Sequence, residues 1–273
     1  MKKKNTVKMI ILSLFSVIQI FPLIWIINFS LKSESEIYTV SSLRLPETPM
    51  FSNYAEAWVK GNVAGYFLNS VFVTFVSVII TVALSCMMGY AITRMQWKGS
   101  GMVLTFLMLG MMIPIHATLI PLFLIMQKAG LLSSHWCIIL PYIAVGLPLA
   151  VFIISNFLRS IPRELEEAAM MDGCGVIRTF AFIIVPVLKP AIATVSIFTF
   201  MSNWNEFIMA STYLQKSEMY TLPIGLTAFR GAYSAALGPM AAAIVITCVP
   251  LIIFYCICSE QVEKSFAAGA VLK

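Results

Sequence analysis

Four consecutive residues, Asn203, Trp204, Asn205 and Glu206, interrupt an otherwise apolar run in the last third of the sequence. Amide and carboxylate groups exchange hydrogen bonds with hydroxyl groups, and an indole ring offers a flat apolar face to a sugar ring. Polar groups within a membrane helix are costly unless they face partners or water. We therefore interpret these residues as candidates for a substrate pathway, with hydrogen bonding between helices as the alternative.

A second group lies in the charged stretch 159–189. Pro162 suits the first position of a helix, the glutamates after it favour the positive N-terminal end, and Gly173 is a natural left-handed stop. The pattern predicts a helix of about eleven residues after Pro162 and a second short helix over 175–185, before Pro186 and Pro190 turn the chain back into the membrane.

One face of the first of these helices carries Leu165, Ala168, Ala169 and Asp172, which recur at helical spacing. The alanine side chains are small enough to let another surface come close. The face is typical either of a docking site for a soluble partner or of an amphipathic hairpin that lies against the bilayer or against the helix ends of the same protein.

The elements that position both groups are predicted to be membrane helices. The sequence of 273 residues is 60% apolar and only 11% charged, with a mean hydropathy of +0.91. Soluble domains average about 45–50% apolar residues and about 25% charged residues. This composition excludes a soluble enzyme and predicts an all-α integral membrane protein with a single transmembrane domain over 1–273. Six apolar runs are long enough to span a bilayer: 9–29, 69–92, 102–126, 136–158, 190–214 and 239–258.

The distribution of basic residues predicts the orientation. Twelve of the 18 Lys and Arg residues lie at the two ends of the chain, between the second and third runs, and between the fourth and fifth. The positive-inside rule places these segments, both termini included, in the cytoplasm. The basic residues form no water-soluble patch with aromatic stacking platforms, so we expect no nucleic-acid partner.

Neither a catalytic nor a metal constellation is evident. The six cysteines form no C-x-x-C pair, and we expect buried inert thiols; His116 and His135 pair with no cysteine or carboxylate by sequence. The G-x-x-x-x-G-K-[ST] phosphate loop is absent. We therefore predict a protein that is not an enzyme and that holds no metal.

The stretch 159–189 resembles the EAA loop of importer-type ABC permeases. The matching residues are Glu167-Ala168-Ala169, then Gly173, then Ile183, then Val185-Pro186, although Val185 stands where the pattern normally has leucine. Further matches resemble the carbohydrate branch, of the maltose-permease type: Pro162 through Gly173 to Lys189-Pro190, Asn69-Ser70, Gly89-Tyr90-Ala91 with Arg94, Ile113-Pro114 through Leu119-Ile120-Pro121-Leu122, and Trp204-Asn205-Glu206-Phe207.

The resemblance implies a type I ABC importer permease in a bacterial plasma membrane. It implies a second, different permease subunit, two cytoplasmic ATPases that hold ATP and Mg²⁺, and an extracytoplasmic sugar-binding protein, with no cofactor in this chain. Glu167 would pair with a basic residue of the ATPase, Ala168 and Ala169 would allow close approach, and Gly173 would let the coupling helix turn. The remaining coupling candidates are Asp172 and Pro186.

Two alternatives stay open. The first is an ABC permease for a solute other than a sugar. The second is a secondary carrier, which would normally show ionisable pairs within the membrane or broken-helix repeats, whereas Glu206 is the only acidic residue inside a predicted span.

Overall fold

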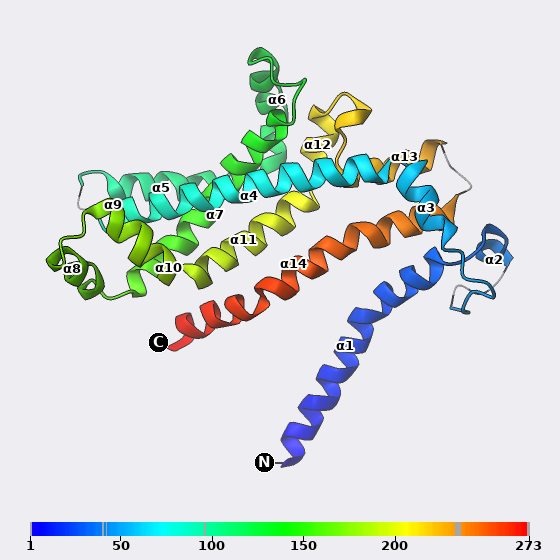
Figure 1. Ribbon diagram of the computed structural model, residues 1–273, viewed down its shortest axis with the longest axis horizontal. Coiled ribbons are helices and arrows are strands. Elements are labelled where there is room, and N and C mark those ends of the chain that lie inside the picture. The colour runs from blue at the N-terminus through cyan, green and yellow to red at the C-terminus, as the bar shows by residue number, and fades with distance from the viewer. Residues whose placement is uncertain (1, 40, 42, 96, 233–235, 272–273) are drawn as a thin grey trace. The chain divides into compact units, whose positions relative to one another are not determined.

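A computed structural model describes residues 2–39, 41, 43–95, 97–232 and 236–271, and the secondary structure of this part of the chain is helical throughout (Figure 1). Four helical segments are long and apolar enough to cross a membrane, and the number rises to six when each of two bent helix pairs is counted as one span. The four segments are Lys8–Ser30 of α1 (Lys2–Ser30), α4 (Val63–Thr93), α7 (Trp136–Ser160) and Leu237–Gln261 of α14 (Leu237–Val271).

These segments are helical because the polar backbone of an apolar segment finds no water in lipid and must satisfy its hydrogen bonds internally. The 31 residues of α4, at 1.5 Å per residue, extend for about 46 Å, which exceeds the hydrocarbon thickness of about 30 Å. The predicted all-α fold is confirmed, and the four to six candidate spans agree with the six spans that the sequence predicts.

The third predicted span is broken in the middle. The chain forms α5 (Ser100–Gly110), the 3-10 helix η1 (Ile115–Thr118) and α6 (Leu119–Lys128), and the two halves are bent by 93°. Pro114 precedes η1 with an extended ψ of 122°. Because proline has no N–H group and disfavours a helical residue before it, the helix cannot continue through this position. The segment 102–126 is therefore not one straight helix.

The fifth predicted span, 190–214, also consists of two pieces. Helix α11 (Lys189–Trp204) ends at Trp204, and α12 (Ile208–Tyr213) begins after a three-residue break. At its other end, α11 meets the segment Val176–Val187 at an angle of 73°. Pro190 lies in the first turn of α11, where the missing N–H group costs nothing.

The chain separates into two compact units. The first unit combines Met1–Leu68 with Thr221–Pro250. The segment between α1 and α4 contains the short helices α2 (Glu34–Thr39) and α3 (Ser52–Val59), and α13 (Leu222–Ala232) belongs to the same unit. The amide of Asn53 donates to the carbonyl oxygens of Ser30 and Lys32, at 2.8 and 3.0 Å. It thereby satisfies carbonyl groups that the end of α1 leaves free.

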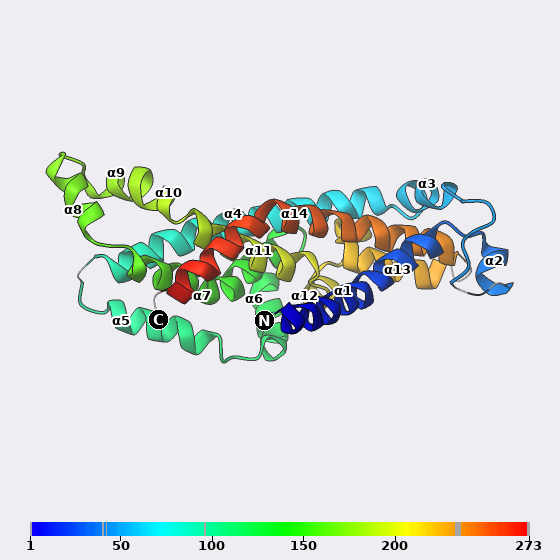
Figure 2. The same cartoon turned by 90° about the horizontal axis from the view of Figure 1, so that it is seen from below.

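The second unit combines Asn69–Tyr220 with Leu251–Lys273 and contains both groups of candidate residues. In it α7 packs against α11 and α5 (Figure 2). Gly89 of α4 lies so close to α7 that a Cβ atom there would be 2.7 Å from Cγ2 of Ile154. The rings of Phe200 and Phe254 stack with centroids 4.1 Å apart. The cysteines are less uniformly buried than expected: Cys86 and Cys137 are buried, but Cys256 is exposed. That the whole chain is one transmembrane domain stays a prediction.

Candidate functional site: the hairpin 159–189 and the cavity of the second unit

The first helix of the hairpin is α8 (Glu164–Met171), which is shorter than predicted because it begins after Arg163 rather than at Pro162. Glu164, Glu166 and Glu167 all lie in its first turn, where the helix dipole favours negative charge. The helix thus forms where the sequence predicts it, with the acidic residues at the expected end.

The C-terminal end of α8 is a Schellman motif. Gly173 has a φ of +80°, its N–H donates to the carbonyl oxygen of Met170, and the N–H of Cys174 donates to that of Ala169. This pair of hydrogen bonds satisfies carbonyl groups at the helix end and needs a left-handed residue, which glycine adopts without steric cost. The prediction that Gly173 ends the helix is confirmed.

The two sides of α8 differ in exposure. Glu166 and Ala169 are buried, with 7% and 4% of their surface exposed, whereas Glu167, Ala168 and Asp172 are exposed. Ala169 therefore does not share an open surface with Ala168. Successive helical residues are turned by about 100°, and the body of the second unit covers the side to which Ala169 points.

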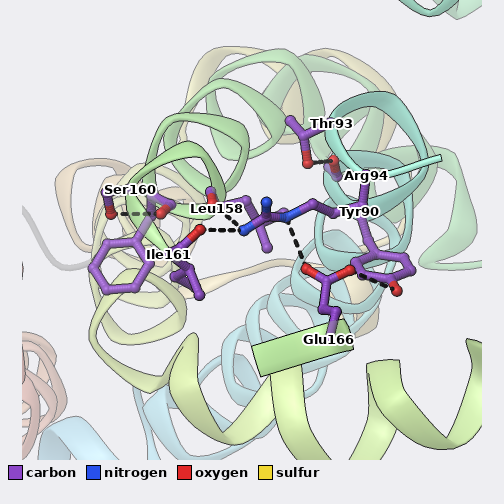
Figure 3. Close-up of polar contacts among 9 residues, drawn as sticks. Tyr90, Thr93, Arg94, Leu158, Ser160, Ile161 and Glu166 are labelled. Atoms are coloured by element: carbon purple, nitrogen blue, oxygen red, sulfur yellow. Dashed lines mark hydrogen bonds and ion pairs between the residues drawn. The ribbon is translucent and has the colours of Figure 1, made fainter. Parts of the chain in front are cut away.

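A buried ion pair holds this covered side. Nε of Arg94, just beyond the end of α4, lies 2.9 Å from Oε1 of Glu166, and both side chains are at least nine-tenths buried (Figure 3). These two atoms are held by charge attraction rather than by a well-aligned hydrogen bond. The hydroxyl of Tyr90 donates to the other carboxylate oxygen at 3.3 Å.

The same guanidinium group reaches the end of α7. Nη2 of Arg94 donates to the carbonyl oxygens of Leu158 and Ile161, at 2.7 and 2.6 Å (Figure 3). The last carbonyl groups of a helix lack partners within the helix, and a cation is favourable there. A single side chain therefore joins α4, α7 and α8.

The second helix of the hairpin, predicted over 175–185, is continuous from Val176 to Val187 but changes type. It begins as α9 (Val176–Arg178), continues as the π-helix η2 (Thr179–Ile184) and ends as α10 (Val185–Val187). Pro186 cannot donate the hydrogen bond that an α-helix needs one turn earlier, and a local π segment is one way to accommodate such a gap. Pro186 itself is exposed.

Apolar packing supports the hairpin beneath the ion pair. Ile184 and Leu188 are fully buried in a cluster with Cys86 and Tyr90 of α4 and with residues of α7 and α11. The rings of Tyr90 and Phe180 lie 5.0 Å apart. On the uncovered side the hairpin instead presents large apolar groups to its surroundings, namely Leu165, Met170, Met171, Ile177 and Phe182.

The second group of candidate residues borders a cavity of about 620 Å³ within the second unit. Its lining comes from α5, η1, α6, α7, α11 and α12 and is mostly apolar. The polar side chains that it contains are those of Thr118, Tyr142, Thr199, Ser202, Asn203 and Glu206. Asn203 and Glu206 thus share a face, as their spacing predicts, whereas the lining does not include Trp204 or Asn205.

Glu206 has a structural role in this wall. Its carboxylate accepts hydrogen bonds from the N–H groups of Met209 and Ala210, at 2.8 and 3.0 Å, and from the hydroxyl of Tyr142 at 2.7 Å. It therefore caps the start of α12 and ties it to α7, which explains why the helical run stops at Trp204 and begins again at Ile208.

The other three candidates differ in environment. The amide nitrogen of Asn203 has no hydrogen-bond partner among the described residues, although Asn203 is only 9% exposed. Trp204 is 1% exposed and stacks on Phe200 at 5.4 Å, so its ring is part of the core. Asn205 is exposed and its amide donates to the carbonyl oxygen of Met201 at 2.8 Å.

Sequence reasoning did not identify three residues of these sites: Glu166, Tyr142 and, as a partner of α8, Arg94. A basic residue directly after a long apolar run was the available signal for Arg94. Tyr142 carried no such signal, because its partner is 64 residues away. Within the described ranges, no three His, Cys, Asp or Glu side chains are placed so that they could hold a metal ion.

These features define a class of protein: a multi-pass membrane subunit with several apolar helices, a helical hairpin that is exposed on one side, and a partly polar cavity among its helices. A family model for the binding-protein-dependent transport system inner membrane component matches residues 81–259. The chain belongs to this family, and the expected non-enzymatic role of a transport permease agrees with it.

Several known proteins are similar over nearly the whole chain. The diacetylchitobiose uptake system permease protein NgcG of Streptomyces coelicolor is 34% identical over 95% of this chain and 86% of its own length. The melibiose/raffinose/stachyose import permease protein MelC of Bacillus subtilis is 29% identical over 99% of each chain. The crystal structure of a bacterial ABC transporter involved in the import of alginate superposes with a TM-score of 0.82 at 24% identity, over 95% of this chain and 96% of that one. The predicted importer-permease fold is therefore confirmed.

Proposed function

We propose that this chain is the membrane-spanning subunit of an ATP-driven sugar importer, that it forms half of the translocation pathway, and that α8 docks on a cytoplasmic ATPase. The family, together with the substrates of the relatives NgcG and MelC, supports sugar import. The observation that carries the coupling role is the exposed side of the hairpin, where Glu167 and Ala168 lie beside uncovered apolar groups such as Leu165 and Met171.

The remaining parts of the proposal follow from this role. The partners are a second, different permease subunit, two ATPases that bind ATP and Mg²⁺, and an extracytoplasmic sugar-binding protein. The distribution of basic residues supports a position of the hairpin and both termini on the cytoplasmic side of a bacterial plasma membrane. In this arrangement Glu167 pairs with a basic residue of the ATPase, Asp172 lies at the exposed end of α8, and Gly173 and Pro186 shape the turn back into the membrane.

A crosslinking experiment tests the docking. Ala168→Cys and Ala169→Cys are matched variants, since the two residues have the same size and adjacent positions, but Ala168 is exposed and Ala169 is buried. A thiol crosslinker on the purified complex should join position 168 to a co-purified ATPase and leave position 169 unreacted. A wild-type complex without an ATPase, or equal crosslinking from both positions, would contradict the docking of α8.

The cavity supports a pathway for a neutral sugar. Its volume of about 620 Å³ lies within the usual range of ligand pockets, about 300–1,000 Å³. The buried amide of Asn203 offers an unused donor, which a sugar hydroxyl can accept. Among the described residues that line the cavity, Glu206 alone carries a charge, and none is a lysine or arginine that would attract an acidic sugar.

Transport kinetics test this pathway. Asn203→Ala should raise the sugar concentration needed for half-maximal uptake, whereas Asn205→Ala should have a much smaller effect because its amide is bonded within α11. The matched pair separates a role in the cavity from a general effect of losing an amide. Unchanged kinetics for Asn203→Ala with diacetylchitobiose, trehalose and melibiose would remove Asn203 from the pathway.

A further inference from the structure

Arg94 and Glu166 form a connection that the docking surface itself does not explain. Glu166 is adjacent to Glu167 but points about 100° away around the helix axis, into the second unit, where it pairs with Arg94 at 2.9 Å. Arg94 continues directly from α4, because its N–H donates to the carbonyl oxygen of Tyr90 at 2.9 Å. The pair therefore links α8 to the end of α4 without any covalent connection nearby.

The covalent connections of α8 are poorly suited to transmitting movement. On one side, Ile161 has an extended backbone with a ψ of 128° and separates α7 from α8. On the other side, Gly173 is left-handed and Gly175 has an extended ψ of 163°. Non-helical residues at the ends of an element can absorb rotation as hinges. A side-chain link is therefore needed to carry a movement of α8 to the membrane helices.

The guanidinium group of Arg94 provides that link to two helices at once. One of its nitrogens donates to the carbonyl oxygens of Leu158 and Ile161, at the end of α7, and another lies against the carboxylate of Glu166 (Figure 3). The planar, rigid fork of arginine suits several simultaneous contacts of this kind. Because both charges are buried, separating them leaves an uncompensated charge, which makes the joint resistant to opening.

We infer that Arg94 and Glu166 are positioning residues that transmit the movement of the docked α8 to α4 and α7. This inference rests on the proposed docking of α8. The two adjacent glutamates then have separate roles: Glu167 faces the ATPase, and Glu166 fixes the helix to its own subunit. Tyr90 supports the pair, since its hydroxyl donates to Glu166 and its ring packs on Phe180 of the second hairpin helix.

The test uses the complete complex, with both permeases, both ATPases and the binding protein, in proteoliposomes. The variants are Glu166→Gln, which removes one charge of the pair, and Glu164→Gln, which removes an exposed carboxylate from the same turn of α8. Three quantities are measured: ATPase that co-purifies, ATP hydrolysed, and radiolabelled diacetylchitobiose, trehalose or melibiose imported per ATP.

We expect Glu166→Gln to retain the ATPase and to hydrolyse ATP, but to import roughly tenfold less sugar per ATP, since coupling between distant sites is typically worth a factor of about 5–150. Glu164→Gln should behave as the wild type. Arg94→Lys should fall between them, because lysine keeps the charge but has a single amine for three acceptors. If Glu166→Gln does not fold, the amount of sugar imported per ATP is measured for Arg94→Lys instead.

Two results would overturn the inference. One is a wild-type ratio of sugar to ATP in Glu166→Gln or, if that variant does not fold, in Arg94→Lys. The other is loss of the ATPase from Glu166→Gln but not from Glu164→Gln, which would make Glu166 part of the docking surface. The proposed function fails separately, through a wild-type complex that contains no ATPase or imports none of the three sugars.

Discussion

Gly89 allows α4 to approach α7 so closely that one added methyl group would collide with Ile154. An ideal Cβ atom at Gly89 would lie 2.7 Å from Cγ2 and 3.3 Å from Cβ of Ile154, whose side chain is completely buried. The contact is with a branched side chain in a packed core, so neither partner can rotate away freely. Gly89→Ala should therefore lower the free energy of unfolding by about 1–3 kcal/mol, as other overpacking substitutions do.

A double-mutant cycle separates this collision from other effects of the substitution. Ile154→Ala removes the Cγ2 atom and leaves a cavity, at a cost of about 2–5 kcal/mol. In the double variant the new methyl group at position 89 occupies part of that cavity. The stability losses of the two single variants should therefore sum to more than the loss measured for the double variant. The expected difference is about 1–2 kcal/mol, which is within the usual range for residues in contact.

The measurement is denaturant titration of the purified protein in micelles, followed by tryptophan fluorescence. Gly101→Ala is the control, because Gly101 is also helical but a Cβ atom there would have nothing within 4 Å. We expect that control to be neutral or slightly stabilising, since alanine is the better helix former. Wild-type stability of Gly89→Ala, or costs that add without any coupling, would refute the close approach of α4 and α7.

Three further outcomes are expected. Gly173→Ala should destabilise the end of α8 by about 1–2 kcal/mol, because an alanine at a φ of +80° is strained even though the space around it is open. The expected readout is less co-purified ATPase, and Gly173→Asn should have a milder effect. Glu206→Gln should lower the free energy of unfolding by about 1–2 kcal/mol through weaker capping of α12, measured as a lower apparent melting temperature. Tyr142→Phe should lower it less, because both backbone hydrogen bonds to Glu206 remain. Hydrogen bonds from the N–H groups of Glu47 and Ser33 lower the pKa of Glu36 below its ordinary value of 4.5. The contribution of Glu36 to stability is therefore present above pH 4.5 and is lost as the pH falls below that value towards the lowered pKa. Protease protection of the loop 33–47 should follow this course, and Glu36→Gln should abolish the pH dependence.

Local signals predicted much of the fold. Hydropathy located the spans because each helix in lipid must be apolar over its own length, whatever its neighbours are. The turn at Gly173 was predictable for a similar reason, since a left-handed helix end depends on the residue at that position. The break at Pro114 has a local cause as well, but its angle of 93° depends on what α5 and α6 pack against, and a single sequence does not contain that information.

Tertiary contacts decide what the sequence could not. The ring of Trp204, interpreted as a face for a sugar, is instead stacked in the core on Phe200. Glu206, interpreted as a pathway residue, also caps α12 and binds Tyr142. Both residues carry polar groups or a large ring within an apolar run. Such a side chain can make its hydrogen bonds and ring contacts equally well with the protein or with a ligand. Only the positions of the neighbouring helices distinguish the two.

The alanine pair of α8 illustrates how a helix can be constrained on two sides. Ala168 and Ala169 differ by about 100° around the axis, and only Ala169 is covered by the second unit. A residue as large as leucine at 169 would push α8 away from Arg94, because Glu166 lies one turn earlier on the same side and could no longer reach it. A larger residue at 168 would leave the ion pair intact and obstruct only the exposed side. A short helix that is fixed to its own subunit on one side and bound by a partner on the other therefore needs a small residue on each.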